Sequence, residues 1–303
     1  MASPEAEALK EAFKQLQESL GGSDYAPTIE EQRANVAGLG TTATVLPDVA
    51  ITEAYAGGCR AYWHDPPGAV EDRAILYLHG GGYVLGSPKT HERLVSHLAS
   101  ATGARVLNLD YRLAPEHPHP AAVEDATAAY RWLLDQGFLP GYVAISGDSA
   151  GGGLSLAALI SIREQGFPQP AGAVPLSPWV DLEGTGNSMV SNAENDLLVQ
   201  KEMLQGMAAS FLGEGGDARD PLAAPVYGDY RDLAPIYIQV GGDETLLDDS
   251  TRVVERAKAA GVEVKLDVFP EMQHVFQTGV GNVPEATDAV GRIGDWLRAK
   301  LGI

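Results

Sequence analysis

Short runs of apolar residues alternate with longer amphipathic segments over most of the chain, from about residue 55 onward. Short apolar runs predict strands, and apolar residues recurring three or four positions apart predict helices. The predicted strands are residues 74–78, 105–109, 142–146, 172–176, 236–240 and 262–269. The predicted helices are residues 91–101, 121–136, 150–165, 250–260 and 284–301. This alternation indicates an α/β fold with a mostly parallel central sheet and helices on both faces.

The last predicted strand, residues 262–269, differs from the others in its pattern. Val262, Val264, Leu266 and Val268 alternate with charged residues, whereas central parallel strands are apolar on both faces. We therefore expect one face of this strand to be exposed to solvent, and we place the strand at the edge of the sheet. At such an edge a second copy of the chain can pair with it.

Two segments interrupt the alternation of strands and helices. Residues 1–45 have a helical pattern and no strand signal, and residues 187–220 form an insertion between two strands. In an α/β enzyme, a helical insertion after the carboxyl end of a strand lies over the site. We therefore expect both segments to form a helical cap on an α/β core made of residues 46–186 and 221–303.

The insertion contains one clear helical pattern, in which Met203, Met207 and Phe211 recur every four residues. These side chains either line a substrate pocket under the cap or form the packing face of an ordinary amphipathic helix. The pattern is compatible with both interpretations.

Charge and cysteine content narrow the class of protein. The chain has 21 Lys and Arg against 41 Asp and Glu, a net charge of −20, which disfavours nucleic acid and anionic membranes as partners. Cys59 is the only cysteine, so neither an intrachain disulfide nor a cysteine cluster for zinc is expected. The first residues lack the pattern of a signal peptide, and no stretch approaches the ~20 apolar residues of a membrane span. We expect a soluble, cytoplasmic protein.

A G-x-S-x-G pentapeptide, residues 147–151, connects a predicted strand to a predicted helix. A sharp turn of this kind needs small residues on both sides, because only glycine tolerates the close backbone approach, and the residue at the apex projects above the sheet. Ser149 stands at this apex and at a helix N-terminus, where its hydroxyl is presented as a nucleophile. The alternative is a glycine-rich turn with an incidental serine. The presence of oxyanion donors, an acid and a base elsewhere in the chain distinguishes the two interpretations.

A serine nucleophile needs backbone donors for the oxyanion that develops on the substrate. The first predicted strand is followed by His79 and then by Gly80, Gly81 and Gly82. Without side chains in the way, their N–H groups can point at one spot and form an oxyanion hole together with the N–H of Ala150, while His79 braces the loop. The pattern leaves open which of the three glycines donate, and a merely flexible loop is the alternative.

A catalytic triad also needs an acid and a base. Asp243 directly follows the strand 236–240, at the edge where α/β sheets build their sites. Glu244, Asp248 and Asp249 compete with it, although the last two are better explained as caps of the next helix. His274 follows the last strand and is the one histidine in the position that a base requires. Serine, acid and base then occur in the chain order of α/β-hydrolases.

Taken together, these motifs resemble the hormone-sensitive-lipase-like family of α/β-hydrolases. The matching segments are H-G-G-G at 79–82, D-Y-R-L-A-P-E at 110–116, G-D-S-A-G-G at 147–152, L-S-P-W-V-D at 176–181 and H-V-F at 274–276. They span about two thirds of the chain in the expected order. The resemblance implies an α/β-hydrolase fold with a helical cap, a carboxylesterase acting on short to medium acyl chains, and dimers formed through the last strand.

The predicted reaction is hydrolysis of a small-molecule ester through an acyl-enzyme. Ser149 attacks the carbonyl, His274 accepts its proton, and Asp243 holds the imidazole; no metal or cofactor is expected. Lactone, amide or acetyl hydrolysis on the same triad is an alternative, because acyl choice depends on pocket walls. A non-catalytic ligand receptor on the same scaffold is a second alternative, against which the complete triad argues.

Overall fold

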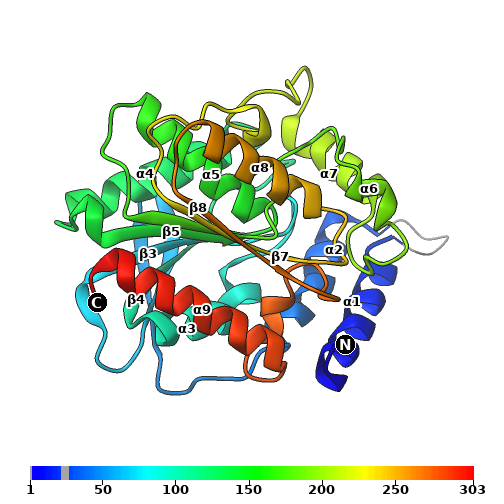
Figure 1. Cartoon of the computed structure of the whole chain (residues 1–303), viewed down its shortest axis with the longest axis horizontal. Helices are drawn as coiled ribbons and strands as arrows, with labels where there is room; N and C mark the ends of the chain where they lie inside the picture. Colours follow the sequence, from blue (N-terminus) through cyan, green and yellow to red (C-terminus); the bar gives the residue numbers. More distant parts are fainter. Residues whose placement is uncertain (1, 22–26) are drawn as a thin grey trace.

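The computed structural model describes residues 2–21 and 27–303. Within these residues, one eight-stranded sheet with the order β1-β2-β4-β3-β5-β6-β7-β8 forms the centre of the molecule (Figure 1). The strands are β1 (Ala50–Ala56), β2 (Cys59–Asp65), β3 (Val70–Leu78), β4 (Ala104–Leu109), β5 (Val143–Asp148), β6 (Gly172–Leu176), β7 (Ile236–Gly241) and β8 (Val264–Phe269). Strands β3 to β8 run parallel, whereas β2 pairs antiparallel with β1 and β4. The predicted α/β fold is confirmed.

Helices cover both faces of the sheet. On one face, α3 (Pro88–Thr102) packs against α9 (Pro284–Leu301); α4 (Ala121–Asp135), α5 (Ala150–Glu164) and α8 (Leu247–Ala259) cover the other (Figure 1). Every residue of the central strand β5 is buried, because helices exclude water from both of its sides. This double cover explains why the central strands are continuous apolar runs in the sequence.

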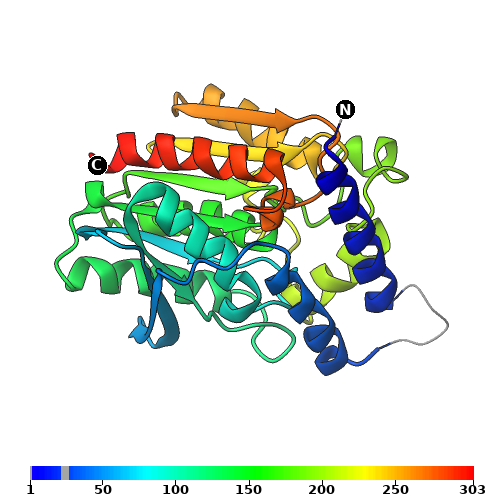
Figure 2. The same cartoon turned by 90° about the horizontal axis from the view of Figure 1, so that it is seen from below.

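The remaining helices gather at the end of the sheet toward which the parallel strands point (Figures 1 and 2). They are α1 (Pro4–Gly21), α2 (Ile29–Asn35), η1 (Val36–Thr41), α6 (Ser188–Ser191) and α7 (Lys201–Leu212). Short 3₁₀ turns complete the structure: η2 (Pro140–Tyr142), η3 (Pro225–Tyr227) and η4 (Phe276–Gly279). In both views the N-terminal helices lie beside the α6–α7 segment, although about 150 residues separate the two in sequence.

The predicted strands and helices are all present, with ends that differ by at most four residues. The hairpin of β1 and β2 has no counterpart among the predicted strands. Its signal is the Gly57-Gly58 pair between two alternating segments, a sequence typical of a two-residue hairpin turn. Both glycines have positive φ, 61° and 97°, as such a turn requires.

The helical prediction for residues 1–45 is confirmed by α1, α2 and η1; the part that concerns residues 1 and 22–26 lies outside the described residues. Arg33 fastens α2 to the core through a salt bridge of 2.7 Å to Glu116 and a hydrogen bond to the Val84 carbonyl. The helical pattern of the insertion is confirmed by α7.

Strand β8 forms one edge of the sheet, as predicted. Its apolar residues are less buried than the alternation suggests, since Val264 and Leu266 are half-buried and Val268 is 43% exposed. Across residues 2–21 and 27–303, none of the helices has the length and apolar character needed to cross a lipid bilayer.

Candidate active site

Ser149 occupies the sharp turn between β5 and α5. Its φ of 54° and ψ of −120° place it in a region that non-glycine residues rarely adopt. The turn is pressed against β3, because a Cβ added to Gly151 would lie 1.9 Å from the carbonyl oxygen of Leu78. Glycine is therefore required beside the serine for steric reasons. The strained turn holds Ser149 at the N-terminus of α5, where the helix dipole stabilises negative charge.

The glycine loop that follows β3 has one N–H that is engaged and two that are not. The N–H of Gly80 donates to Oδ1 of Asp148 at 3.1 Å. The N–H groups of Gly81 and Gly82 have no acceptor among the described residues, and both residues line the same cavity as Ser149. Ala150 is the first residue of α5, so its N–H has no acceptor within the helix. Of the three candidate glycines, Gly81 and Gly82 thus present free donors and Gly80 does not.

The side chain of Asp148 holds the glycine loop in place by hydrogen bonds. Besides the Gly80 N–H, its Oδ1 accepts a hydrogen bond from the Tyr77 hydroxyl at 2.7 Å, and its Oδ2 lies 3.1 Å from Nε2 of His91. Burial alone would raise the pKa of the Asp148 carboxyl, but the charge and hydrogen bond of His91 outweigh burial and lower it. A buried, charged Asp148 therefore ties the glycine loop to the serine turn.

His79 supports the same loop, as the sequence suggests. Its Nδ1 lies 2.8 Å from the carbonyl oxygen of Gly80, and its ring stacks on Tyr111 with 4.4 Å between ring centres. Burial lowers the pKa of His79 to about 3, so the imidazole is neutral at neutral pH. A neutral, stacked ring suits a structural brace.

His274 is buried and makes a hydrogen bond to Glu244, with 2.9 Å between Nδ1 and Oε2. The other carboxylate oxygen of Glu244 accepts hydrogen bonds from the Ser177 hydroxyl at 2.6 Å and from the Gly241 N–H at 2.5 Å. Burial disfavours the charged imidazolium, yet the hydrogen bond and the charge of Glu244 outweigh burial and raise the pKa of His274 above 6.5. The pair can therefore accept and hold a proton.

Asp243, the acid predicted from the sequence, does not contact His274. Its carboxylate lies 3.6 Å from Nζ of Lys10 on α1 and is about one quarter exposed. The prediction of Asp243 as the partner of His274 is therefore wrong, and its alternative Glu244 takes that position. The reason is the path of the loop: Gly241 passes so close to Met272 that a Cβ would lie 2.2 Å from its carbonyl oxygen. In this tight loop, residue 244 faces inward and residue 243 faces α1.

The two other acidic alternatives hold a neighbouring loop in place. Both are in the first turn of α8 rather than at its cap position. Asp249 is buried and accepts hydrogen bonds from the N–H groups of Val180 and Asp181, at 2.8 and 3.0 Å. Asp248 accepts one from the N–H of Ser188 at 3.1 Å. Neither carboxylate hydrogen-bonds to His274.

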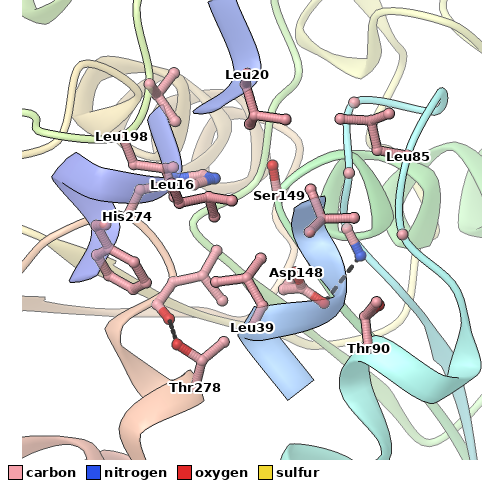
Figure 3. A pocket seen from close by; sticks show the side chains of 18 of the residues that line it. Leu16, Leu20, Leu39, Leu85, Thr90, Asp148, Ser149, Leu198, His274 and Thr278 are labelled. Atoms are coloured by element: carbon pink, nitrogen blue, oxygen red, sulfur yellow. Dashed lines mark hydrogen bonds between the residues drawn. The ribbon is translucent and has the colours of Figure 1, made fainter. Parts of the chain in front are cut away.

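Ser149 and His274 line one cavity with largely apolar walls (Figure 3). The N-terminal helices contribute Leu16 and Leu20 from α1, and Leu39 from η1; these side chains lie around Ser149 and His274 in Figure 3. The insertion also contributes, because Met203 and Met207 line the cavity while Phe211 instead stacks on Tyr83. Two of the three residues in the α7 pattern therefore belong to the pocket, and the third serves packing.

Comparisons with known proteins identify the family of this chain. A family model described as the alpha/beta hydrolase fold matches residues 75–278. An acetyl-hydrolase of Streptomyces hygroscopicus is 43% identical over 302 residues, which cover 100% of this chain and 99% of the relative. The crystal structure of an esterase from the bacterial hormone-sensitive lipase family is 45% identical and matches with a TM-score of 0.95, covering 100% of both chains. The chain belongs to the hormone-sensitive-lipase-like family of α/β-hydrolases.

Another relative of this α/β-hydrolase is an esterase of Acinetobacter venetianus, 38% identical over 222 residues that cover 73% of each chain. Within the described part of the chain, no group of three or more His, Cys, Asp or Glu side chains is arranged to hold a metal ion. The family model and these relatives confirm the resemblance to the hormone-sensitive-lipase-like family that the sequence motifs indicate.

Three residues that support the site in this hydrolase are absent from the sequence-based candidates: Ser177, Asp148 and His91. Ser177 directly follows β6, so its place at the carboxyl edge of the sheet is a usable signal. Asp148 lies inside the pentapeptide, but its partner His91 comes from α3. The Asp148–His91 pair joins segments that are distant in the sequence, and no local sequence pattern indicates it.

Proposed function

We propose that this α/β-hydrolase is a serine carboxylesterase for short- to medium-chain acyl esters, with Ser149 as nucleophile, His274 as base and Glu244 as acid. Family membership and relatives named esterase and acetyl-hydrolase make the chain a carboxylic ester hydrolase. The assignment of the residues rests chiefly on the hydrogen bond between His274 and Glu244, which lies at the cavity that contains Ser149.

In the first half-reaction, the Ser149 hydroxyl attacks the ester carbonyl and transfers its proton to Nε2 of His274. Glu244 accepts the Nδ1–H, which keeps Nε2 unprotonated beforehand and stabilises the imidazolium afterwards. The free N–H groups of Gly81, Gly82 and Ala150 bind the oxyanion. When the tetrahedral intermediate collapses, the C–O bond to the alcohol breaks and His274 returns the proton to the leaving oxygen.

In the second half-reaction, a water molecule replaces the alcohol. His274 takes a proton from this water as it attacks the acyl carbonyl, and the same N–H groups bind the second oxyanion. Collapse of this intermediate releases the carboxylic acid and returns the proton to Ser149. The reaction needs only side chains, backbone amides and water.

The apolar walls of the cavity support an acyl ester as substrate. Leucine and methionine side chains cannot satisfy polar groups, so they favour a hydrocarbon arm next to the ester. A narrower specificity for acetyl esters is a second candidate, favoured by the end-to-end similarity to a protein named acetyl-hydrolase. Lactone or amide hydrolysis on the same triad is an alternative that the substrate series below also bears on.

The test is hydrolysis of p-nitrophenyl acetate, butyrate, octanoate and palmitate by wild type, Ser149→Ala and His274→Ala. We expect wild-type turnover to be greatest for a short chain and both variants to lose it while remaining folded. A profile restricted to acetate would favour the acetyl-hydrolase alternative. Turnover that survives in Ser149→Ala would overturn the assignment, and a folded wild type inactive on all four esters would redirect attention to lactones and amides.

Three further features belong to this proposal. The helices α1, α2, α6 and α7 act as a two-part cap, which is supported by side chains from both parts in the cavity wall. Two copies pair through β8, an edge strand with Val268 exposed; light scattering on wild type and Val268→Lys tests this pairing. We place the protein in the cytoplasm, where a free cysteine such as the buried Cys59 stays reduced; cell fractionation tests this location.

A further inference from the structure

A second hollow lies directly outside the active-site cavity. Leu20 of α1 and Met203 and Met207 of α7 line both hollows, so these three side chains form the boundary between them. The outer hollow lies between α1, α2 and α7 and is open to solvent. The two hollows are therefore adjacent, and an arm of a bound molecule that passes these side chains would enter the outer hollow.

The two hollows differ in the chemistry of their walls. The inner cavity is lined chiefly by leucine, valine, methionine and glycine residues around Ser149 and His274. The outer hollow contains five polar side chains that do not line the inner cavity. These polar residues are Gln17, Gln32, Gln200, Glu202 and Ser210.

Several of these side chains already donate hydrogen bonds within the protein. Nε2 of Gln32 donates to the Pro27 carbonyl at 3.1 Å, and Nε2 of Gln200 donates to the Asp196 carbonyl at 2.7 Å. The Ser210 hydroxyl donates to its own helix. These residues still offer a ligand their acceptor oxygens, and Gln32 also keeps one free N–H.

Two of the polar side chains have no partner among the residues that the structure describes. Within the described chain, neither Gln17 nor Glu202 has a hydrogen bond or an ion pair. The carboxylate of Glu202 adds two further acceptor oxygens, and together with the net charge of −20 it disfavours an anionic ligand. The outer hollow therefore suits a group that carries several hydrogen-bond donors and no negative charge.

We propose, on the basis of the esterase function above, that the outer hollow binds the alcohol part of the ester and that this alcohol carries additional hydroxyl groups. An ester has two arms, and the apolar cavity suits the acyl arm. The other arm then passes Leu20, Met203 and Met207, and its hydroxyl groups donate to the unpaired acceptors. The substrate class is thus short acyl esters of polyhydroxylated alcohols that carry no negative charge.

Two butyrate esters of equal size test this inference. One is glycerol 1-monobutyrate, and the other is 2-methylbutyl butyrate, in which a methyl group replaces each free hydroxyl. The measurement is kcat/KM for each ester from acid release at constant pH, reported as the ratio of the glycerol ester to the alkyl ester.

The decisive comparison is between the wild type and the double variant Gln17→Leu/Glu202→Leu. The difference in chemical reactivity between the two esters is the same for both proteins, so it cancels. We expect the ratio to fall about tenfold in the variant, since hydrogen bonds at a solvent-open site are worth about 1 kcal/mol each. The single variant Glu202→Gln, which keeps the shape of the side chain, should lower the ratio by a smaller factor.

The matched control is Gln15→Leu/Gln205→Leu. Both residues are exposed, lie on the same two helices and line neither hollow, so the wild-type ratio should persist. An unchanged ratio in both the double variant and Glu202→Gln would overturn this inference alone. A folded wild type without turnover of either ester or of p-nitrophenyl butyrate would overturn the proposed function and this inference with it.

Discussion

Replacement of Glu244 by Gln tests which carboxylate orients the base. In the wild type, Oε1 of Glu244 accepts from Ser177 and Gly241 while Oε2 faces Nδ1 of His274. In the variant, the amide oxygen must stay with those two donors, so the NH₂ group faces Nδ1. Nδ1 then becomes the acceptor and the ring proton moves to Nε2, where the imidazole can no longer take the proton of Ser149.

The expected magnitude follows from this change of tautomer. The corresponding Asp→Asn change in a serine protease triad lowers kcat about 10⁴-fold, and we expect a loss of about 10³ to 10⁴ here, or roughly 4–5.5 kcal/mol in the barrier. The matched control is Asp243→Asn. This change removes an ion pair of 3.6 Å between partly exposed groups, which is worth about 0–1 kcal/mol of stability and should leave kcat within about twofold.

The assay is the hydrolysis of p-nitrophenyl butyrate, with kcat and KM measured separately and thermal unfolding recorded for each variant. Glu244→Gln should lose kcat with little change in KM, because the acid does not touch the substrate. The reasoning is refuted if Glu244→Gln keeps activity within about tenfold of wild type while Asp243→Asn loses about 10³-fold.

Three further predictions concern buried titratable groups. Asp148→Asn keeps an acceptor oxygen for the Gly80 N–H but places an amide NH₂ group opposite His91. We expect kcat to fall about 10- to 100-fold, KM to change less, and the free energy of unfolding to fall by about 1–3 kcal/mol. A kcat equal to that of wild type would contradict a role of Asp148 in holding the glycine loop. Because His274 must be neutral to act as base, kcat/KM should fall as the pH drops through a midpoint above 6.5, and a midpoint below that value would contradict the pairing with Glu244. Burial raises the pKa of Asp249 from 3.8 to about 7. The stability that this carboxyl contributes is fully present below pH 3.8 and is lost as the pH rises from 3.8 through 7. Asp249→Asn should therefore show a smaller fall in Tm between pH 3.8 and 7 than wild type does.

Much of the fold is predictable from the chain because its central strands are buried on both faces and its outer helices on one. The resulting apolar runs and helical periods survive as patterns in the sequence, and β6 and α9 have the predicted bounds. The β1–β2 hairpin is missing from those predictions because its first strand is largely exposed. A strand with little burial has little apolar signal, and only its Gly57-Gly58 turn indicates it.

The same distinction between local and long-range contacts applies to the candidate site. The serine turn and the glycine loop are readable because close backbone contacts, such as that of Gly151 with Leu78, exclude every residue except glycine. Contacts between distant segments leave no comparable mark. The pairing of Asp148 with His91 joins residues 57 positions apart, and either residue alone has an ordinary environment in the sequence.

The sequence by itself determined the fold class, the family and the identity of Ser149 and His274 as candidates, because strand periodicity, glycine sterics and chain order are local properties. Only the tertiary structure decided between Asp243 and Glu244, and between Gly80 and the two glycines after it. In both cases neighbouring residues of suitable chemistry compete, and the path of a packed loop determines which side chain or N–H faces the cavity. That path is set by contacts with segments far away in the chain, such as the one between Gly241 and Met272.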